Sequence, residues 1–535
     1  KEHKRLPEWE GEFYFEYHRG TYTSMARNKK SNRRCEQLLM DLELYSILAG
    51  MDYSQQLHQM WRVVLMNQFH DILPGTSIEE VYEVTKEEYN HVEAKLREYI
   101  DHCIANLVRK KENHVTVFNQ LGFERDDIIH LPKVDGDCLV DKKGQRFLLQ
   151  KTEDGCMAYL THVPSKSQAT YEVLQLTADE KASIKNPFTI HERGIKTPFY
   201  EVRFNANGQI VSILDCEQKR ELVQENKVAN HFKLYEDKPM DYDNWDIEMY
   251  YSEKYYDITD LTMFEWTQVG PVRAVLKVEY AFSQSRLCQE IVFYSQSRRI
   301  DFNTYVDYKE KQHLLKVHFP MDIHTDEATF DIQFGNLTRK THKNTSWDQA
   351  RFEVCGQKWI DISEGNYGVS LLNDCKYGHS VHGSDMGLTL LKSGILPNPN
   401  TDQEEHTFRY SLYPHNGDWK KARTVEEAYK FNQQAYAVTG EAQGDQQALV
   451  TTDDANVLIE TIKEAQDHEG IIIRIYEYEN SRTRTKVRWN LGTLICVEEC
   501  NLIEEVEQTI EHDENSFNIV IKPFEIKTYK IKYVK

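Results

Sequence analysis

The feature that most constrains the fold is a change in hydrophobic periodicity near residue 112. Before this point, apolar residues recur every three or four positions, the spacing of one face of an α-helix. From Val115 onward the period is two, the spacing of one face of a β-strand. Such a chain is expected to form a helical unit followed by a long β-region. Its 535 residues are too many for one hydrophobic core, so several domains are expected.

Three apolar stripes predict three helices in the first part of the chain. Gly50 ends the first helix, and Pro74-Gly75 ends the second because proline cannot continue the backbone hydrogen bonding. Thr76 and Glu79 have the spacing of a capping box that opens the third. Short connections predict an antiparallel three-helix bundle over 23–111. The stripes are Cys35, Leu38, Leu39, Leu42, Tyr45 and Leu48; Leu57, Trp61, Val64, Leu65 and Phe69; and Ile78, Val81, Thr85, Tyr89, Val92, Leu96, Ile100, Cys103 and Leu107.

The rest of the chain has the pattern of antiparallel β-structure. Residues 204–211 predict a hairpin with an Asn-Gly turn. So long a β-region is best closed as antiparallel sandwiches, so we predict an α+β multidomain protein with two or more sandwich subdomains over 112–535. Further strands are predicted at 115–119, 274–280, 471–478 and 524–531.

The composition narrows the range of possible partners and locations. The net charge of −21 argues against nucleic acid as a partner, because a diffuse excess of acid repels phosphate backbones. No run of eighteen apolar residues exists, so no membrane span is expected. Ten scattered cysteines are interpreted as reduced thiols, and the first nine residues lack the apolar region of a signal peptide. We therefore expect a cytoplasmic protein.

The segment Asn-Gln-Phe-His-Asp-Ile-Leu-Pro-Gly-Thr-Ser at 67–77 is the strongest candidate for a functional site. A neutral imidazole such as that of His70 is the commonest metal ligand in proteins, and the carboxylate of Asp71 beside it could bind sugar hydroxyls. A lone His-Asp pair is more often structural, and no H-x-x-x-H or H-E-x-x-H partner lies nearby. Any metal site must therefore be completed by distant residues.

This segment resembles a signature of the glycoside hydrolase family 38 α-mannosidases. The similarity is greater to the bacterial and vacuolar branch of the family than to the Golgi branch. Residues 11–24 resemble the block that precedes the helical middle domain of that family. Residues 117–125 resemble the segment that opens its β-region, with Gln120 in place of the usual proline. The similar segments follow the order of the family and include 243–246, 373–378 and 406–415.

The resemblance implies a retaining, zinc-dependent α-mannosidase that acts on a mannose-containing oligosaccharide or mannoside. It implies a galactose-mutarotase-like β-region, with His70 as a zinc ligand and Asp71 as a contact to the sugar. The zinc would be a Lewis-acid template that binds mannose hydroxyls. Weaker substrate-binding candidates are His18, Arg19, Asp243, Trp245, Asp246 and Tyr377.

In this family the nucleophile, the acid/base carboxylate and the other zinc ligands belong to an α/β domain that precedes the block similar to 11–24. We find none of its motifs, so we expect no catalytic residue in this chain and no activity from the chain alone. One histidine cannot hold zinc tightly, because affinity comes from several preorganised ligands. Residues 1–22 are predicted to be the end of that domain and a connector.

Three alternatives stay open at this stage. The chain could be a non-catalytic carbohydrate-binding or scaffold protein built from the same modules. It could belong to a glycosidase with altered sugar specificity, or to a family member that acts on phosphorylated mannosyl-glycerate. Large sandwich faces often pair, so a homodimer is compatible with every reading.

Overall fold

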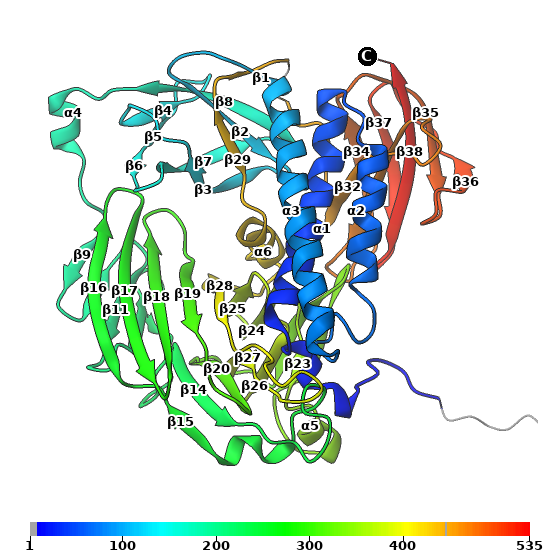
Figure 1. The fold of residues 1–535 in the computed structure, drawn as a ribbon. Coiled ribbons are helices and arrows are strands. Elements are labelled where there is room, and N and C mark those ends of the chain that lie inside the picture. The colour runs from blue at the N-terminus through cyan, green and yellow to red at the C-terminus, as the bar shows by residue number, and fades with distance from the viewer. Residues whose placement is uncertain (1–7, 445–446, 535) are drawn as a thin grey trace, which may run out of the picture.

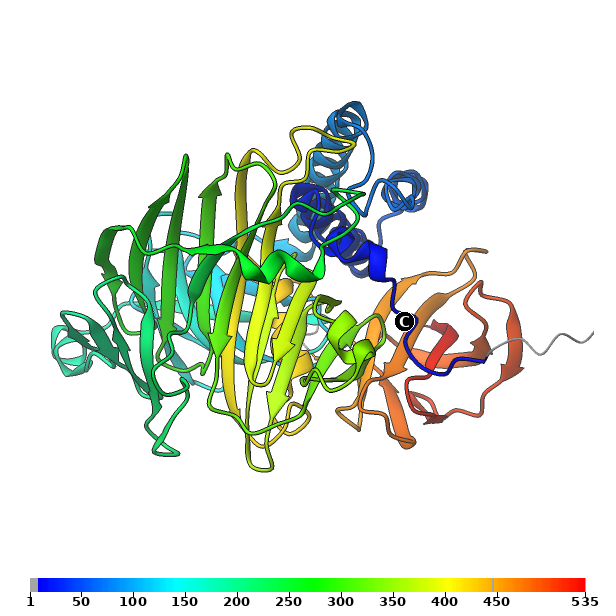
Figure 2. The same ribbon diagram turned by 90° about the horizontal axis from the view of Figure 1, so that it is seen from below.

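The computed structural model describes residues 8–444 and 447–534, and it confirms the predicted α+β multidomain class (Figure 1). The three long N-terminal helices stand between a C-terminal β-unit and two other β-units (Figures 1 and 2). Within the described ranges, no helix is both long enough and apolar enough to cross a membrane.

Three helices form the predicted bundle: α1 (Ala26–Ala49), α2 (Ser54–Met66) and α3 (Glu79–Leu107). α1 ends at Gly50, whose φ of 63° is a left-handed conformation that glycine adopts without strain. The shared core contains most of the first and third predicted stripes, because both periods match the contact faces of α1 and α3. Shorter helices are α4 (Ala178–Ser183), α5 (Ser346–Ala350), α6 (Thr424–Asn432), η1 (Glu16–His18), η2 (Gly20–Tyr22) and η3 (Met249–Glu253).

Two predictions about the helix ends are wrong. α2 ends at Met66, well before Pro74, and Leu65 and Phe69 are 56% and 50% exposed. α3 has Ile78 as its N-cap, without a side-chain cap, and the hydroxyl of Thr76 donates to Asp71 inside the preceding turn. Local hydrogen bonds within residues 67–76, and those from Lys29 to Leu73 and Pro74, shape this segment as turns instead of helix.

The central β-unit is the largest and contains two sheets that share one core. A nine-stranded sheet has the order β16 (Leu261–Val269), β17 (Arg273–Phe282), β18 (Ser285–Tyr294), β19 (Ile300–Asp307), β28 (Glu405–Asn416), β25 (Tyr367–Asn373), β24 (Trp359–Ser363), β21 (Glu327–Ile332) and β22 (Gly335–Lys340). Facing it is a sheet of β15 (Tyr255–Asp257), β14 (His231–Glu236), β20 (His313–Pro320), β27 (Asp385–Lys392), β26 (Gly378–His382) and β23 (Val354–Cys355). A five-stranded sheet adjoins them: β13 (Arg220–Glu221), β12 (Ile210–Asp215), β11 (Tyr200–Phe204), β10 (Gly194–Lys196) and β9 (Thr189–His191).

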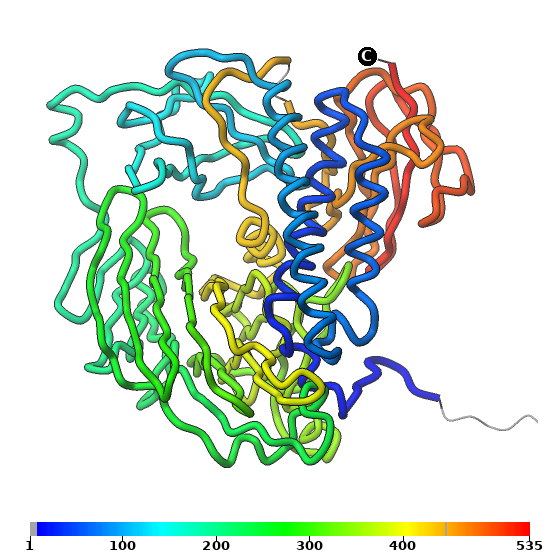
Figure 3. The backbone as a smooth tube through the Cα atoms, in the orientation of Figure 1, coloured from blue at the N-terminus to red at the C-terminus, as the bar shows by residue number. Residues whose placement is uncertain are grey.

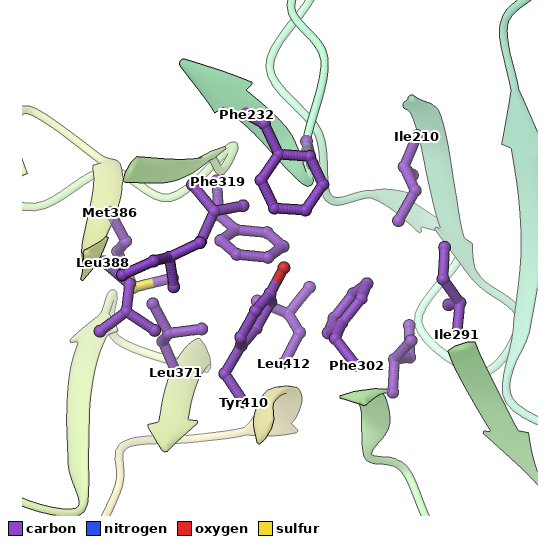
Figure 4. Packing of buried hydrophobic residues seen from close by; sticks show 14 of the residues in the cluster. Ile210, Phe232, Ile291, Phe302, Phe319, Leu371, Met386, Leu388, Tyr410 and Leu412 are labelled. Atoms are coloured by element: carbon purple, nitrogen blue, oxygen red, sulfur yellow. The ribbon is translucent and has the colours of Figure 1, made fainter. Parts of the chain in front are cut away.

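Aromatic rings fill the space between the two large sheets (Figure 4). The rings of Phe302 and Tyr410 stack with centroids 5.0 Å apart. The Tyr410 hydroxyl donates to Asn230 Oδ1 at 2.9 Å, so its polar end is satisfied inside the core. Every second residue of the strands points into this core, which leaves the alternate residues of the nine-stranded sheet facing outward.

Two smaller β-units complete the chain. One pairs the sheet β29 (Tyr436–Thr439), β2 (His114–Asn119), β8 (Ser167–Leu174), β4 (Cys138–Val140) and β5 (Arg146–Leu148) with β3 (Arg125–Leu131), β7 (Cys156–Val163) and β6 (Gln150–Lys151). The C-terminal sandwich pairs β31 (Val450–Thr452), β34 (Thr483–Trp489) and β37 (Ser516–Ile521) with β32 (Val457–Glu464), β33 (Ile471–Glu477), β38 (Ile526–Val534), β35 (Thr493–Cys500) and β36 (Val506–Thr509). A short ladder joins β1 (Val108–Arg109) to β30 (Glu441–Ala442).

Each predicted strand corresponds to a strand of the structure: 115–119 to β2, 274–280 to β17, 471–478 to β33 and 524–531 to β38. The predicted hairpin at 204–211 runs from the end of β11 to the start of β12. Gly208 in the predicted hairpin turn has a φ of 74°, the left-handed conformation that such a turn needs.

α1 joins the units because its faces pack against different partners. Leu38, Leu39 and Leu42 lie in the bundle core, whereas Leu44 is 1% exposed and belongs to the core of the C-terminal sandwich. Arg33 donates to Asn373 and Gln357 of the central β-unit at 2.9–3.2 Å. α1 therefore connects the bundle to both the central β-unit and the C-terminal sandwich.

We expect Leu44→Ala to destabilise the chain by about 2–5 kcal/mol, because it leaves a cavity between α1 and the C-terminal sandwich. Leu65→Ala is the matched control, since Leu65 is 56% exposed and its truncation should change stability by less than about 0.5 kcal/mol. Urea unfolding of the two variants, followed by fluorescence, measures the difference. Equal unfolding midpoints would contradict the assignment of Leu44 to that core.

Candidate functional site at the end of the helical bundle

The segment that carries His70 and Asp71 is a series of tight turns between α2 and α3. It lies at the end of the bundle from which the N-terminal segment also leaves (Figure 3). The amides of Ile72 and Leu73 donate to the carbonyl of Phe69 at 2.9 and 3.2 Å. The amide of Thr76 donates to the carbonyl of Asp71 at 3.1 Å. These bonds coil the backbone so that residues 69–71 face outward.

Buried side chains of the helices hold this turn from inside. The ammonium group of Lys29 donates to the carbonyls of Ser24, Leu73 and Pro74 at 2.5, 2.8 and 3.1 Å. The Tyr82 hydroxyl lies 3.1 Å from the carbonyl of Asp71. Lys29 is 5% exposed, and burial lowers the pKa of its ammonium group, an effect that nearby Asp402 opposes.

Gly75 closes the turn where no other residue fits. Its φ is 94°, and a Cβ atom there would lie 2.3 Å from the carbonyl oxygen of Ser24. The close approach brings the end of the turn against the start of α1. It also leaves the Gly75 carbonyl free to accept a hydrogen bond from Asn244, at 2.9 Å.

His70 and Asp71 are the exposed part of this rigid turn. Their side chains are 75% and 38% exposed, and His70 Nε2 lies 3.4 Å from Asp71 Oδ2. The other oxygen of Asp71 accepts a hydrogen bond from the Thr76 hydroxyl at 2.9 Å. The Phe69 ring lies 4.1 Å from the imidazole, centroid to centroid. The turn therefore presents one imidazole and one oriented carboxylate to the outside.

Among the described residues, two groups have three potential metal ligands close together: Glu124, Asp126 and His162, and Asp402, Glu404 and His406. Neither group contains His70. The described chain thus offers at most a histidine and an aspartate for a metal at the His70 turn.

Arg19 and Asp246 lie close together in the structure and bind each other. Arg19 Nη1 lies 3.3 Å from Asp246 Oδ1, and both side chains are buried. The guanidinium group also donates to the carbonyl of Ala350 at 3.0 Å and lies over the Phe352 ring. This pair joins the N-terminal segment to the central β-unit, and its role toward a substrate stays a prediction.

Asp243 and Trp245 flank the same contact. Asp243 is 8% exposed and accepts a hydrogen bond from the Ile395 amide at 3.1 Å. The carbonyl of Trp245 accepts from the Gly20 amide at 2.7 Å, while its half-buried ring packs near Tyr242. Segment 243–246 and the His70 turn are therefore connected, through the Asn244–Gly75 hydrogen bond described above.

The two remaining candidates lie in different surroundings. His18 is exposed in η1, next to the Phe15 ring. Tyr377 is half-buried, and its hydroxyl accepts from Arg33 Nε at 2.9 Å, with the guanidinium group 4.3 Å above its ring. Tyr377 lines a cavity of about 730 Å³ that also reaches Gln68 and Leu73, on the inner side of the His70 turn.

Sequence reasoning missed the two residues that position the turn, Lys29 and Asn244. Asn244 is fully buried and donates to Gly75 and to the Thr401 hydroxyl, both at 2.9 Å. Lys29 lies in the polar and charged run 27–34, so nothing local distinguishes it from its neighbours. The partners of both residues lie far away in the chain, so no spacing could reveal them.

Three family models match successive parts of the chain. The alpha mannosidase middle domain matches residues 16–107, and the glycosyl hydrolases family 38 C-terminal domain matches residues 195–400. The family 38 C-terminal beta sandwich domain matches residues 456–529. The chain therefore belongs to glycoside hydrolase family 38.

Curated relatives extend the match along the chain. Alpha-mannosidase G of Dictyostelium discoideum is 31% identical over 98% of this chain and 53% of its own length. Mouse alpha-mannosidase 2C1 is 32% identical over 98% of this chain and 50% of its own. The chain thus spans about half the length of the curated relatives it matches. An alpha-mannosidase structure from Enterococcus faecalis V583 has the same fold, with a TM-score of 0.77 at 16% identity, covering 96% of this chain and 68% of that one.

We expect Lys29→Met to destabilise the turn by at least about 2 kcal/mol, because three buried carbonyls lose a charged donor. The measurement is hydrogen exchange at the amides of Ile72, Leu73, Gly75 and Thr76, which should lose protection. Lys30→Met is the matched control, since Lys30 is adjacent but half-buried and does not contact the turn. Unchanged protection in Lys29→Met would show that Lys29 does not hold the turn.

Proposed function

We propose that this chain is part of a retaining, zinc-dependent α-mannosidase, in which His70 is one zinc ligand and Asp71 contacts the sugar. The observation that carries the proposal is the pairing of an exposed imidazole and an oriented carboxylate on a turn held rigidly from inside. Such rigidity favours binding, because the side chains lose little freedom when they engage a metal or a ligand.

The chemistry of this pair fits a zinc site that residues outside 1–535 complete. Within the described chain, no other residue bonds to His70 Nδ1, so this ring nitrogen is available to a metal while Nε2 faces Asp71. A carboxylate beside the second nitrogen of a ligating histidine orients the ring and raises its basicity. Zinc, when bound, would supply Lewis-acid polarisation of sugar hydroxyls.

The residues of this chain would bind and orient the substrate. Thr76 holds Oδ1 of Asp71, and Oδ2, which faces His70 Nε2, has a second lone pair that could accept a hydrogen bond from a mannose hydroxyl. His18, Arg19, Asp243, Trp245, Asp246 and Tyr377 remain weaker candidates for the same surface. The nucleophile and the acid/base carboxylate of a retaining mechanism would come from outside this chain.

We further propose a mannose-containing oligosaccharide or mannoside as substrate and a cytoplasmic location. All ten cysteines are free thiols in the structure, which supports a reducing compartment. A non-catalytic scaffold is the competing reading, and nothing in the geometry of the His70 turn favours it over the enzyme.

We expect His70→Ala in the whole protein to lower zinc affinity by at least about a hundredfold and to reduce mannosidase activity to the same extent. The reason is that loss of a metal ligand should cost more affinity than loss of the residue that orients it.

Asp71→Asn should largely retain zinc but lower kcat/KM for an aryl α-mannoside by about 10–100-fold, because a charged hydrogen bond to the sugar is lost. Zinc content is measured by elemental analysis of the dialysed protein.

His91→Ala and Asp101→Asn are the controls, because both residues are exposed on α3 and lie outside the core of the bundle. Wild-type zinc content in His70→Ala would contradict the ligand assignment. Unchanged kinetics in Asp71→Asn would contradict the sugar contact.

The isolated 535-residue chain is expected to be inactive on aryl α-mannosides at any zinc concentration, because it lacks the two carboxylates of the reaction. Adding an upstream segment that carries them should restore activity. Zinc-dependent turnover by the isolated chain would overturn our placement of the catalytic groups.

A further inference from the structure

The cavity of about 730 Å³ that Tyr377 lines lies where the helical bundle, the central β-unit and the C-terminal sandwich meet (Figure 2). Its walls come from α1 and the inner side of the His70 turn, from the turns that precede β22 and β24, and from β32 and β33. Ligand pockets commonly have volumes of about 300–1,000 Å³. Of the sugar and metal candidates above, only Tyr377 lines this cavity, so the proposed function leaves it unexplained.

One wall is held together by contacts between the central β-unit and the C-terminal sandwich. The ammonium group of Lys358 lies 3.9 Å from Asp331 Oδ2 and 4.8 Å from the centre of the Tyr429 ring. The hydroxyls of Tyr429 and Tyr476 lie 2.9 Å apart. The Phe334 ring stands at 88° to the Tyr476 ring, with the two centroids 5.5 Å apart. These contacts fix a cation, a carboxylate and aromatic surface along this wall.

A second wall is formed by α1 and the His70 turn. Gln68 Nε2 donates to Glu36 Oε1 at 2.8 Å and to Asn32 Oδ1 at 3.1 Å. Asn32 and Glu36 are four residues apart, so they lie on one face of α1. The Tyr377 ring lies beside them, with the guanidinium group of Arg33 over one of its faces. This wall therefore presents an oriented carboxylate, amide groups and a further ring.

A β-bulge places two consecutive polar side chains in the lining. Between Ile459 and Thr461, the pairing of β32 with β33 shifts by one residue, which leaves Glu460 as the extra residue. Ile459 and Ile462 lie in the core of the sandwich, whereas Glu460 and Thr461 both line the cavity. Bulges re-aim side chains in this way and are common beside functional sites.

Two carboxylates of the lining have free acceptor capacity. Glu36 and Glu460 are half-buried, and neither forms an ion pair with a described residue. Glu36 accepts a side-chain hydrogen bond from Gln68, whereas no donor of the described chain reaches the carboxylate of Glu460. Burial raises the pKa of both groups, and the charge of Lys358 lowers the pKa of both. Their remaining lone pairs are available to the hydroxyl groups of a ligand.

The lining as a whole favours a neutral ligand that both donates and accepts hydrogen bonds. Five basic and four acidic side chains line the cavity, so their charges nearly cancel. Six amide side chains add groups that donate and accept. These amides are Asn32, Gln37, Gln68, Gln333, Gln357 and Gln433. Half-buried rings supply apolar surface, among them those of Tyr22, Trp61 and Phe334. A saccharide, with hydroxyl groups around apolar C–H faces, matches this combination.

An ion is a poorer occupant of the same space. Lys358 and Arg33 act electrostatically on Glu36, so both would repel a metal ion or an amine near it. The carboxylates of Glu36 and Glu460 would in turn repel an anion. A neutral molecule avoids both costs.

We propose that this cavity is a second saccharide site, which binds a short mannose-containing oligosaccharide through Glu36, Glu460 and the aromatic rings beside them. The choice of mannose rests on the proposed function, whereas the site itself rests on the cavity and its lining. The two carboxylates accept hydrogen bonds from sugar hydroxyls, and the amides and Lys358 donate to them. Neither His70 nor Asp71 lines the cavity, so binding there does not require zinc.

The test is calorimetric titration of the whole protein with α-mannotriose, in a background of His70→Ala and Asp71→Asn that removes the proposed zinc site. Glu36→Gln and Glu460→Gln should each weaken mannotriose binding by about fivefold or more, because a charge-assisted hydrogen bond becomes a neutral one. Glu265→Gln is the matched control, since Glu265 is exposed on β16 and does not line the cavity. It should leave the affinity unchanged.

Spermidine, a polycation, is titrated as the alternative ligand. Absence of mannotriose binding in the background protein would overturn the site, and so would unchanged affinity in both Glu36→Gln and Glu460→Gln. Spermidine binding that depends on these carboxylates, without mannotriose binding, would overturn the assignment to a sugar. If Glu460→Gln does not fold, Glu36→Gln decides, because Glu36 is half-buried on α1. Zinc content and activity of His70→Ala test the proposed function separately, so failure of one proposal is distinguishable from failure of the other.

Discussion

The buried ammonium group of Lys29 is the interaction on which the candidate site depends. It gathers the carbonyls of Ser24, Leu73 and Pro74, so one charge fixes both the start of α1 and the inner side of the His70 turn. The carboxylate of Asp402 partly compensates the charge of Lys29. It also accepts a hydrogen bond from the Ala26 amide in the first turn of α1. A turn supported in this way can expose an imidazole and a carboxylate without becoming flexible.

α1 extends this constraint to the whole molecule. Its apolar residues belong to three hydrophobic cores. Its polar side chains line the cavity behind the His70 turn and a second cavity between α1 and the nine-stranded sheet, with Gln37 present in both. A helix with so many partners has little freedom to shift, and 14 of its 24 residues are buried.

The sequence predicted the fold class well and the ends of the helices less well. The spacing of apolar residues reflects which face of a helix or strand is buried, so the buried positions Leu38 and Leu42 and the strands could be predicted. Leu65 and Phe69 continue the period beyond the true end of α2 and are exposed. For the site, the His70–Asp71 pair was recognisable as a motif. The pairing of Arg19 with Asp246 was not, because 227 residues separate them.

The sequence by itself determined which segments are helices and which are strands, since local periodicity and turn residues are set by neighbours along the chain. Tertiary structure alone decided what holds the functional turn and what lines the cavities. Asn244 reaches Gly75 across 169 residues, and Lys29 reaches the carbonyl of Leu73 across 44. Such contacts depend on how the units pack, and no local pattern records the partner that a buried polar group will find.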